Sequence, residues 1–155
     1  MHYNLIDKVY VTSEINQFEK DSLLQCRKIF NQYKIVFVAP TALDLSKYHI
    51  EKKNEIVKRF DASFFTSVQS YNKLLKSDLF YSTFKKFEFL LIYQLDAFVF
   101  KDELCLWVNK GYDYIGAPWY SNFENATEIS EIIGVGNGGF SLRNNHKAIS
   151  ILRRI

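Results

Sequence analysis

The sequence predicts an α/β fold in which helices flank a mostly parallel sheet. Segments typical of strands and of amphipathic helices alternate through roughly the first hundred residues, which is the pattern of βαβ units. Segment 34–39 is continuously apolar, as expected for a strand buried on both faces, and 87–100 is the most apolar stretch of the chain. All six glycines lie at or after Gly111, so we expect the chain to become turn-rich there.

Each element is predicted from its local pattern. The expected strands are rich in β-branched or aromatic residues: 9–11, 34–39, 62–65, the apolar stretch 87–100, 112–115 and 139–142. The expected helices carry apolar residues at helical spacing: 18–33, two within 67–86 that separate near Ser77, 103–110, and one that begins at His146. Residues 41–59 are polar and predict a loop with one short helix.

The composition is that of one globular domain spanning residues 1–155. With 48% hydrophobic and 24% charged residues, the chain is not expected to be disordered. The net charge of +3 is scattered, so no nucleic-acid partner is expected. No apolar run approaches the roughly 18 residues that span a bilayer, and no signal peptide is apparent, which predicts a cytoplasmic protein without a transmembrane segment. Cys26 and Cys105 lie in apolar surroundings and are expected to be buried thiols.

A carboxylate interrupts the most apolar stretch of the chain. Asp96 is costly to bury without a partner, so it is either paired or placed where the strand ends near Gln94. Ligands of open α/β sheets bind outside the carboxyl ends of the strands. The second alternative therefore puts Gln94 and Asp96 in a binding cleft, although Asp96 could also cap the turn that follows.

Residues 111–119 form a second candidate segment. Asp113 lies between two tyrosines, and Pro118 precedes Trp119, whose ring could support the apolar face of a sugar or a base. The alternative is a strand followed by a core tryptophan.

Residues 134–143 form the third candidate segment, with four glycines in six positions. Glycines allow a backbone to approach a ligand closely. The spacing fits a dinucleotide-binding loop poorly because a strand, not a helix, is expected to follow it. The side chains that could donate hydrogen bonds to hydroxyls or phosphates are Asn137, Ser141 and Arg143. The alternative is an unusual turn between two strands.

Together, the segments 91–100, 111–119 and 136–143 resemble the signature of the DUF5672 family. This resemblance implies a GT-A-like (Rossmann-like) fold and a glycosyltransferase that moves a sugar from a nucleotide-sugar donor to a glycan or surface-polysaccharide acceptor. It implies that Tyr114 and Trp119 shape the sugar pocket. It also implies that Asn137, Gly138 and Gly139 approach the substrates. Relatives continue past the helix that begins at His146, so the C-terminal part of the family domain is expected to be missing here.

The resemblance also implies a divalent metal, Mn²⁺ or Mg²⁺, held against the donor diphosphate. The metal-binding position of the fold reads Gln94-Leu95-Asp96, so Asp96 is the expected ligand and the neutral Gln94 weakens the site. Arg143 is expected to neutralise the leaving diphosphate, or else to form a surface ion pair. Asp113 is the expected catalytic base for an inverting transfer.

Two alternatives to a glycosyltransferase remain open. The chain could be a non-catalytic module that binds a nucleotide sugar or a carbohydrate, which the amide at Gln94 favours. It could also be a truncated fragment whose apolar edge needs a partner.

Overall fold

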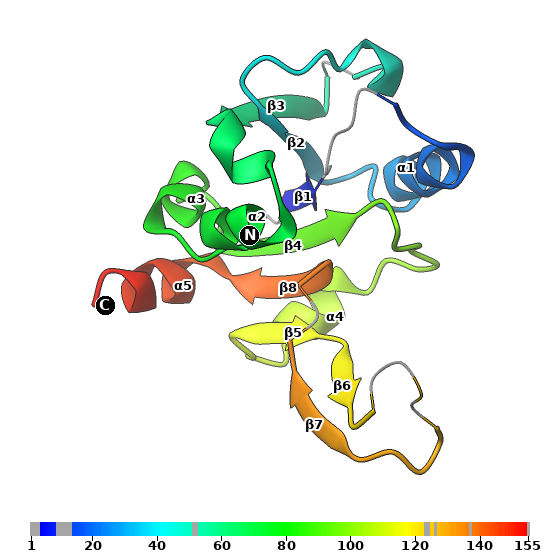
Figure 1. Ribbon diagram of the computed structural model, residues 1–155, viewed down its shortest axis with the longest axis vertical. Coiled ribbons are helices and arrows are strands. Elements are labelled where there is room, and N and C mark those ends of the chain that lie inside the picture. The colour runs from blue at the N-terminus through cyan, green and yellow to red at the C-terminus, as the bar shows by residue number, and fades with distance from the viewer. Residues whose placement is uncertain are drawn as a thin grey trace.

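The computed structural model describes residues 4–8, 14–50, 53–122, 125, 127–136 and 138–154. Its main sheet has six strands in the order β3-β2-β1-β4-β8-β5 (Figure 1). The strands are β1 (Asn4–Lys8), β2 (Lys34–Pro40), β3 (Glu55–Phe60), β4 (Phe89–Gln94), β5 (Tyr114–Gly116) and β8 (Phe140–Asn144).

The direction of the strands makes this a mixed sheet. β3, β2, β1 and β4 run parallel, whereas β8 runs antiparallel to both β4 and β5. A separate antiparallel pair, β6 (Pro118–Tyr120) and β7 (Ile132–Val135), projects from the main body in Figure 1. The α/β class is confirmed, but the expectation of one mostly parallel sheet is too simple. The parallel pattern holds only for the first four strands, and the turn-rich part after Gly111 folds into antiparallel pairs.

Helices cover both faces of the sheet. The helices are α1 (Gln17–Ile29), α2 (Val68–Leu75), α3 (Asp78–Thr83), α4 (Leu104–Val108) and α5 (Asn145–Leu152), with short 3-10 turns η1 (Ser46–Tyr48) and η2 (Ala62–Phe65). One core cluster joins the sheet to α1 and α4, and the other joins it to α2, α3 and α5. None of the helices in the described ranges is long and apolar enough to cross a membrane.

The buried strands alternate between these two cores. In β4, Leu91 and Tyr93 pack on the side of α1, whereas Leu90 and Ile92 pack on the side of α2, α3 and α5. The same alternation continues to Gln94, whose side chain therefore lies on the face of the sheet that α2, α3 and α5 cover. Arg143 of β8 lies on the same face, because it pairs with Leu90 in the register of the two strands.

Capping side chains and an ion pair stabilise the helices α2, α3 and α5. Ser67 and Ser77 cap α2 and α3, since their side chains accept hydrogen bonds from the Ser70 and Phe80 amides. The break expected near Ser77 is thereby confirmed. Arg153 at the end of α5 donates from Nε to Oδ1 of Asp78 over 2.9 Å, and this hydrogen bond lowers the pKa of Asp78. The contact ties α5 to α3.

Four expectations differ from the structure or fall outside it. The strand at 9–11 lies outside the described residues. β3 was missed because its polar residues resemble a loop, and 62–65 is a 3-10 turn because a short apolar run does not distinguish the two. Cys26 is buried, but Cys105 is exposed, because α4 buries only Leu104 and Val108.

Candidate functional site

The carboxyl end of β4 carries the first part of the candidate site. β4 ends at Gln94, and the chain turns at once, with the Ala97 amide donating to the Gln94 carbonyl over 2.9 Å. Asp96 lies exposed in this turn rather than buried. The structure therefore agrees with the alternative in which the strand ends and releases the carboxylate to solvent.

The glycine segment between β7 and β8 lies directly against Gln94. The backbone amide of Gln94 donates to the Gly139 carbonyl over 2.7 Å. A Cβ atom at Gly139 would lie only 2.8 Å from Cδ of Gln94. Any larger residue here would displace the side-chain amide of Gln94 from its present position.

Arg143 follows in β8 on the same face of the sheet. It is 9% exposed, and its guanidinium donates to the Tyr81 hydroxyl (2.7 Å), the Ser141 hydroxyl (3.0 Å) and the Gly138 carbonyl (3.4 Å). Its Cζ atom lies 5.5 Å from the centre of the Tyr114 ring. No carboxylate of the described residues lies within 4.0 Å of the guanidinium.

A cavity of about 700 Å³ opens beside this arginine. We call it the Arg143 cavity. Four residues singled out in the sequence line it together: Tyr114, Trp119, Gly138 and Arg143. Side chains of α2, α3 and α5 complete its wall. Trp119 is 46% exposed and so is not a core tryptophan; its ring lies 3.2 Å from where a Cβ of Gly136 would be.

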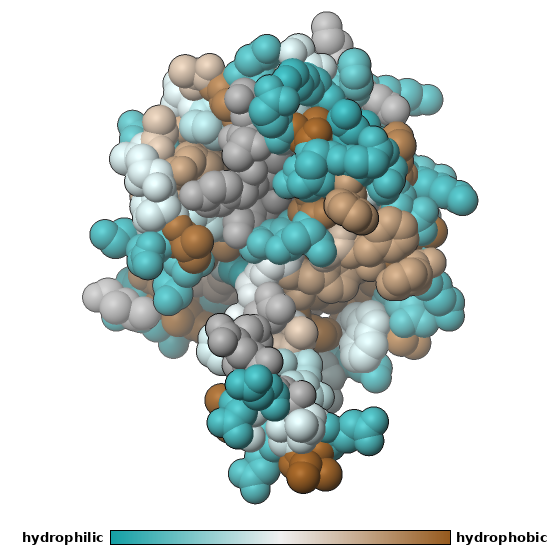
Figure 2. Space-filling model, turned by 45° about the vertical axis from the view of Figure 1, so that its right-hand side comes forward, coloured by the Kyte–Doolittle hydropathy of each residue, from teal (hydrophilic) through white to brown (hydrophobic). Residues whose placement is uncertain are grey.

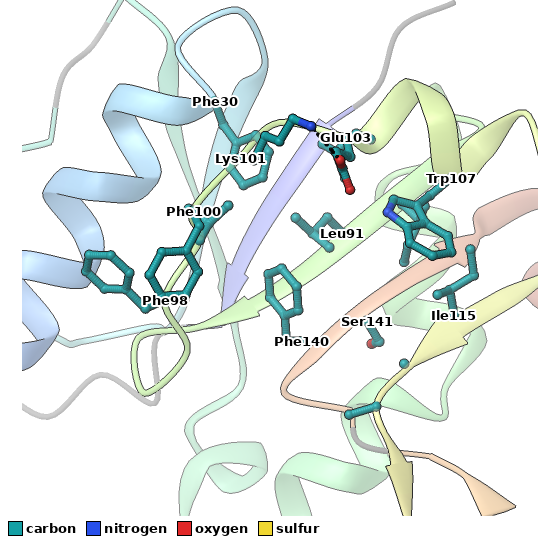
Figure 3. A pocket seen from close by; sticks show the side chains of 15 residues that line it. Phe30, Leu91, Phe98, Phe100, Lys101, Glu103, Trp107, Ile115, Phe140 and Ser141 are labelled. Atoms are coloured by element: carbon teal, nitrogen blue, oxygen red, sulfur yellow. Dashed lines mark hydrogen bonds and ion pairs between the residues drawn. The ribbon is translucent and has the colours of Figure 1, made fainter.

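A second cavity, of about 450 Å³, lies on the opposite face of the sheet (Figure 3). Its wall is largely apolar and includes the partly or largely exposed rings of Phe98, Phe100, Trp107 and Phe140. Figure 2 shows apolar side chains gathered on the body of the molecule above the β6–β7 pair. The charged side chains at this second cavity, Lys101 and Glu103, pair with each other over 2.9 Å. The second cavity therefore suits an apolar group, whereas the Arg143 cavity suits a charged one.

One predicted site residue does not join this arrangement, and another lies outside the described residues. Asp113 precedes β5, where its carbonyl accepts from the Asn144 amide and its exposed carboxylate lies 3.8 Å from Lys147. Asn144 pairs with Phe89 at the start of β4, so Asp113 lies at the sheet edge opposite to Gln94. This position does not support a role as catalytic base. Asn137 lies outside the described residues, and its contact with substrate stays a prediction.

Two residues of the Arg143 cavity could not be identified from sequence patterns. Tyr81 holds the guanidinium but lies among phenylalanines of a helix, where a tyrosine is typical of core packing. Lys76 follows α2 and lines the cavity as one more surface lysine in sequence terms. Only the packing of α2 and α3 on this face of the sheet brings them into the same cavity as Arg143.

The metal expected from the fold would find few protein ligands here. Among the described residues, no three His, Cys, Asp or Glu side chains group closely enough to hold an ion. Asp96 offers one exposed carboxylate, and Gln94 offers a neutral oxygen that already packs on Gly139. Mg²⁺ sites often use one or two carboxylates together with substrate phosphates. These residues fit an ion of that kind, in which the phosphates supply most of the ligands.

Two solved structures of enzymes share this fold. The chain aligns over 99% of its length with 4-diphosphocytidyl-2C-methyl-D-erythritol synthase from Anaerococcus prevotii, at a TM-score of 0.54 and 10% identity, covering 74% of that chain. It aligns over 98% of its length with the mannosyltransferase Ktr4p from S. cerevisiae, at a TM-score of 0.52 and 8% identity, covering 57% of that chain. At these identities the likeness concerns the fold alone.

The sequence itself matches one described family. No curated protein matches the chain significantly. Residues 55–155, more than half of the chain, match the family described as "Protein of unknown function (DUF5672)". The chain therefore belongs to the DUF5672 family.

Proposed function

We propose that this protein binds a nucleotide sugar and transfers the sugar to a glycan acceptor. One observation carries the proposal: the Gln94–Asp96 turn, in which Asp96 is exposed, and the glycine segment at Gly139 meet at the carboxyl end of β4. Open α/β sheets bind ligands at such edges. The fold shared with a mannosyltransferase and with a diphosphocytidyl-erythritol synthase supports this function, as does the resemblance of the sequence motifs.

In this proposal each part of the edge has its own task. Asp96 would hold a divalent ion, which when bound offsets the negative charge of the donor diphosphate. Gln94 would assist by donating from its side-chain amide, in a position fixed by Gly139. Tyr114 and Trp119 would border the sugar. In the transfer, the acceptor oxygen forms a bond to the anomeric carbon, the bond from that carbon to the diphosphate breaks, and the acceptor proton passes to a base other than Asp113.

A binding module without turnover is the second candidate. The neutral side chain at Gln94 favours it, because an amide holds a divalent ion less strongly than a carboxylate. Release of nucleoside diphosphate from a bound donor separates the two candidates, since a binding module would leave the donor intact.

Nucleotide binding can be tested through thermal stability. We expect one of the UDP, GDP, CMP or dTDP nucleotides to raise the unfolding temperature by several degrees in Mn²⁺, since ligand at 100 times its Kd adds about 2.7 kcal/mol. EDTA should reduce the rise. Asp96→Asn should reduce it similarly, because the amide is a weaker ligand. Asp113→Asn is the matched control, an exposed aspartate at the opposite edge, and should keep the full rise.

The outcomes separate the alternatives. Equal losses in Asp96→Asn and Asp113→Asn would remove Asp96 from its proposed role. A rise that survives EDTA in full would replace the metal by direct contacts of the protein with the phosphates. No rise with any nucleotide, in a sample shown to be folded, would overturn donor binding.

A further inference from the structure

We propose that the Arg143 cavity is a binding site for a saccharide that carries a phosphate or a carboxylate, and that Arg143 contacts this anionic group. The cavity shares Tyr114 and Trp119 with the proposed sugar site, but it is distinct from the Gln94–Asp96 turn, because neither Gln94 nor Asp96 lines it. It holds whether or not the protein transfers a sugar.

The charge of Arg143 is the first reason. Arginine keeps its charge at all ordinary pH values, and a charge removed from water is costly unless it is paired. Arg143 is only 9% exposed, yet its described hydrogen-bond acceptors are neutral oxygens of Tyr81, Ser141 and Gly138. These bonds orient the guanidinium but leave its charge uncompensated. An anion in the cavity would supply the missing partner.

The geometry of Arg143 is the second reason. A guanidinium has five N–H donors, and one from each nitrogen is used in the bonds to Tyr81, Ser141 and Gly138, so two remain. The Tyr114 ring, 5.5 Å from Cζ, supports one side of the group. The guanidinium of Arg143 is therefore held in place before any ligand arrives. Fixed guanidinium groups match the paired oxygens of phosphates and carboxylates.

The remaining charges of the cavity point the same way. Lys76 lines it, is exposed, and has no ion-pair partner among the described residues. The described lining residues include no aspartate or glutamate. Two cations without a neighbouring acid create a positive potential, which attracts anions and disfavours cations.

The walls of the cavity indicate what carries the anion. Trp119 presents a half-exposed ring, and Ile151 and Leu152 add apolar surface from α5. A flat aromatic wall near a charged fork suits a ring with one apolar face, such as a sugar, joined to an acidic group. At about 700 Å³ the cavity lies within the roughly 300–1,000 Å³ typical of small-molecule sites.

A purely structural role for Arg143 is the competing explanation. Its bond to Tyr81 links α3 to β8, so the side chain could serve only as a brace. If the role of Arg143 is only structural, its substitution should change stability without changing the affinity for anions. The experiment must therefore measure binding by folded variants rather than stability alone.

The test is calorimetric titration of the full chain at low salt with glucose 1-phosphate, glucuronate and glucose. We expect at least one of the two anionic sugars to bind, glucose to bind at least tenfold more weakly, and added salt to weaken the anionic ligand. Glucose 1-phosphate binding alone assigns a phosphate to the site, and glucuronate binding alone assigns a carboxylate. The Asp96→Asn variant should bind as the unchanged protein does, which separates this inference from the proposed donor site.

Variants identify the residues involved. Arg143→Lys keeps the charge but loses the fork, and should weaken binding at least tenfold, whereas Arg59→Lys on the distant edge strand β3 should have no effect. If Arg143→Lys does not fold, Lys76→Gln and Trp119→Ala test the same cavity, and each should weaken binding severalfold. The proposal is overturned if neither anionic sugar binds, if glucose binds equally well, or if all cavity variants that fold keep full affinity.

Discussion

Replacing Glu55 by alanine is expected to lower the free energy of unfolding by about 3–5 kcal/mol. Glu55 begins β3 with its side chain only 2% exposed, and its carboxylate accepts two hydrogen bonds from Arg27 of α1, over 2.6 and 2.8 Å. The Nη2 atom of Arg27 also donates to the Tyr48 carbonyl. Alanine would leave the charge of Arg27 largely buried without its partner, and α1 would lose its link to the edge strand.

Urea denaturation followed by circular dichroism measures this loss. Glu14→Ala is the matched control, because the Glu14–Lys47 pair is largely exposed and such pairs contribute at most about 1 kcal/mol. The double variant Arg27→Ala with Glu55→Ala should be less destabilised than the sum of the single variants, since it leaves no unpaired charge. A Glu55→Ala loss no larger than that of Glu14→Ala would contradict the expected effect.

The fold was predicted best where burial acts on a single segment. β2 and β4 are buried on both faces, so nearly every residue is apolar and the strands are visible in the sequence. β3 is an edge strand with Lys58 and Arg59 exposed, and this polarity hides it in a loop-like segment. The direction of β8 could not be predicted because it depends on pairing with β4, far away in the sequence.

The candidate site shows the same division. Asp96 could be recognised because a carboxylate in an apolar stretch is unusual, and the strand does end two residues before it. The contact between Gln94 and Gly139 could not be predicted, since it depends on the register of β4 and β8. Asp113 was selected for its chemistry near the motifs. Its position at the opposite edge follows from strand direction. β8 is antiparallel to both β4 and β5, so β5 runs in the same direction as β4, and a residue just before β5 lies at the edge where β4 begins.

Gly139→Val is expected to abolish the nucleotide-induced rise in unfolding temperature. Even a Cβ atom at this position would lie 2.8 Å from Cδ and 2.9 Å from Nε2 of Gln94, and the methyl groups of valine extend further. The Gln94 amide is the end of a flexible side chain, so it can move away into the space proposed for the donor. The cost in stability should stay within about 1–3 kcal/mol, the usual range for overpacking.

Gly134→Val is the matched control in the same glycine segment. A Cβ at Gly134 meets no atom within 4 Å, and valine is favourable in a strand such as β7. This variant should keep the nucleotide response and change stability by less than about 0.5 kcal/mol, the usual range for surface substitutions. If Gly139→Val folds and responds to nucleotide as the unchanged protein does, Gln94 has no part in donor binding. If both glycine variants lose the response equally, the effect belongs to the whole segment rather than to the contact between Gly139 and Gln94.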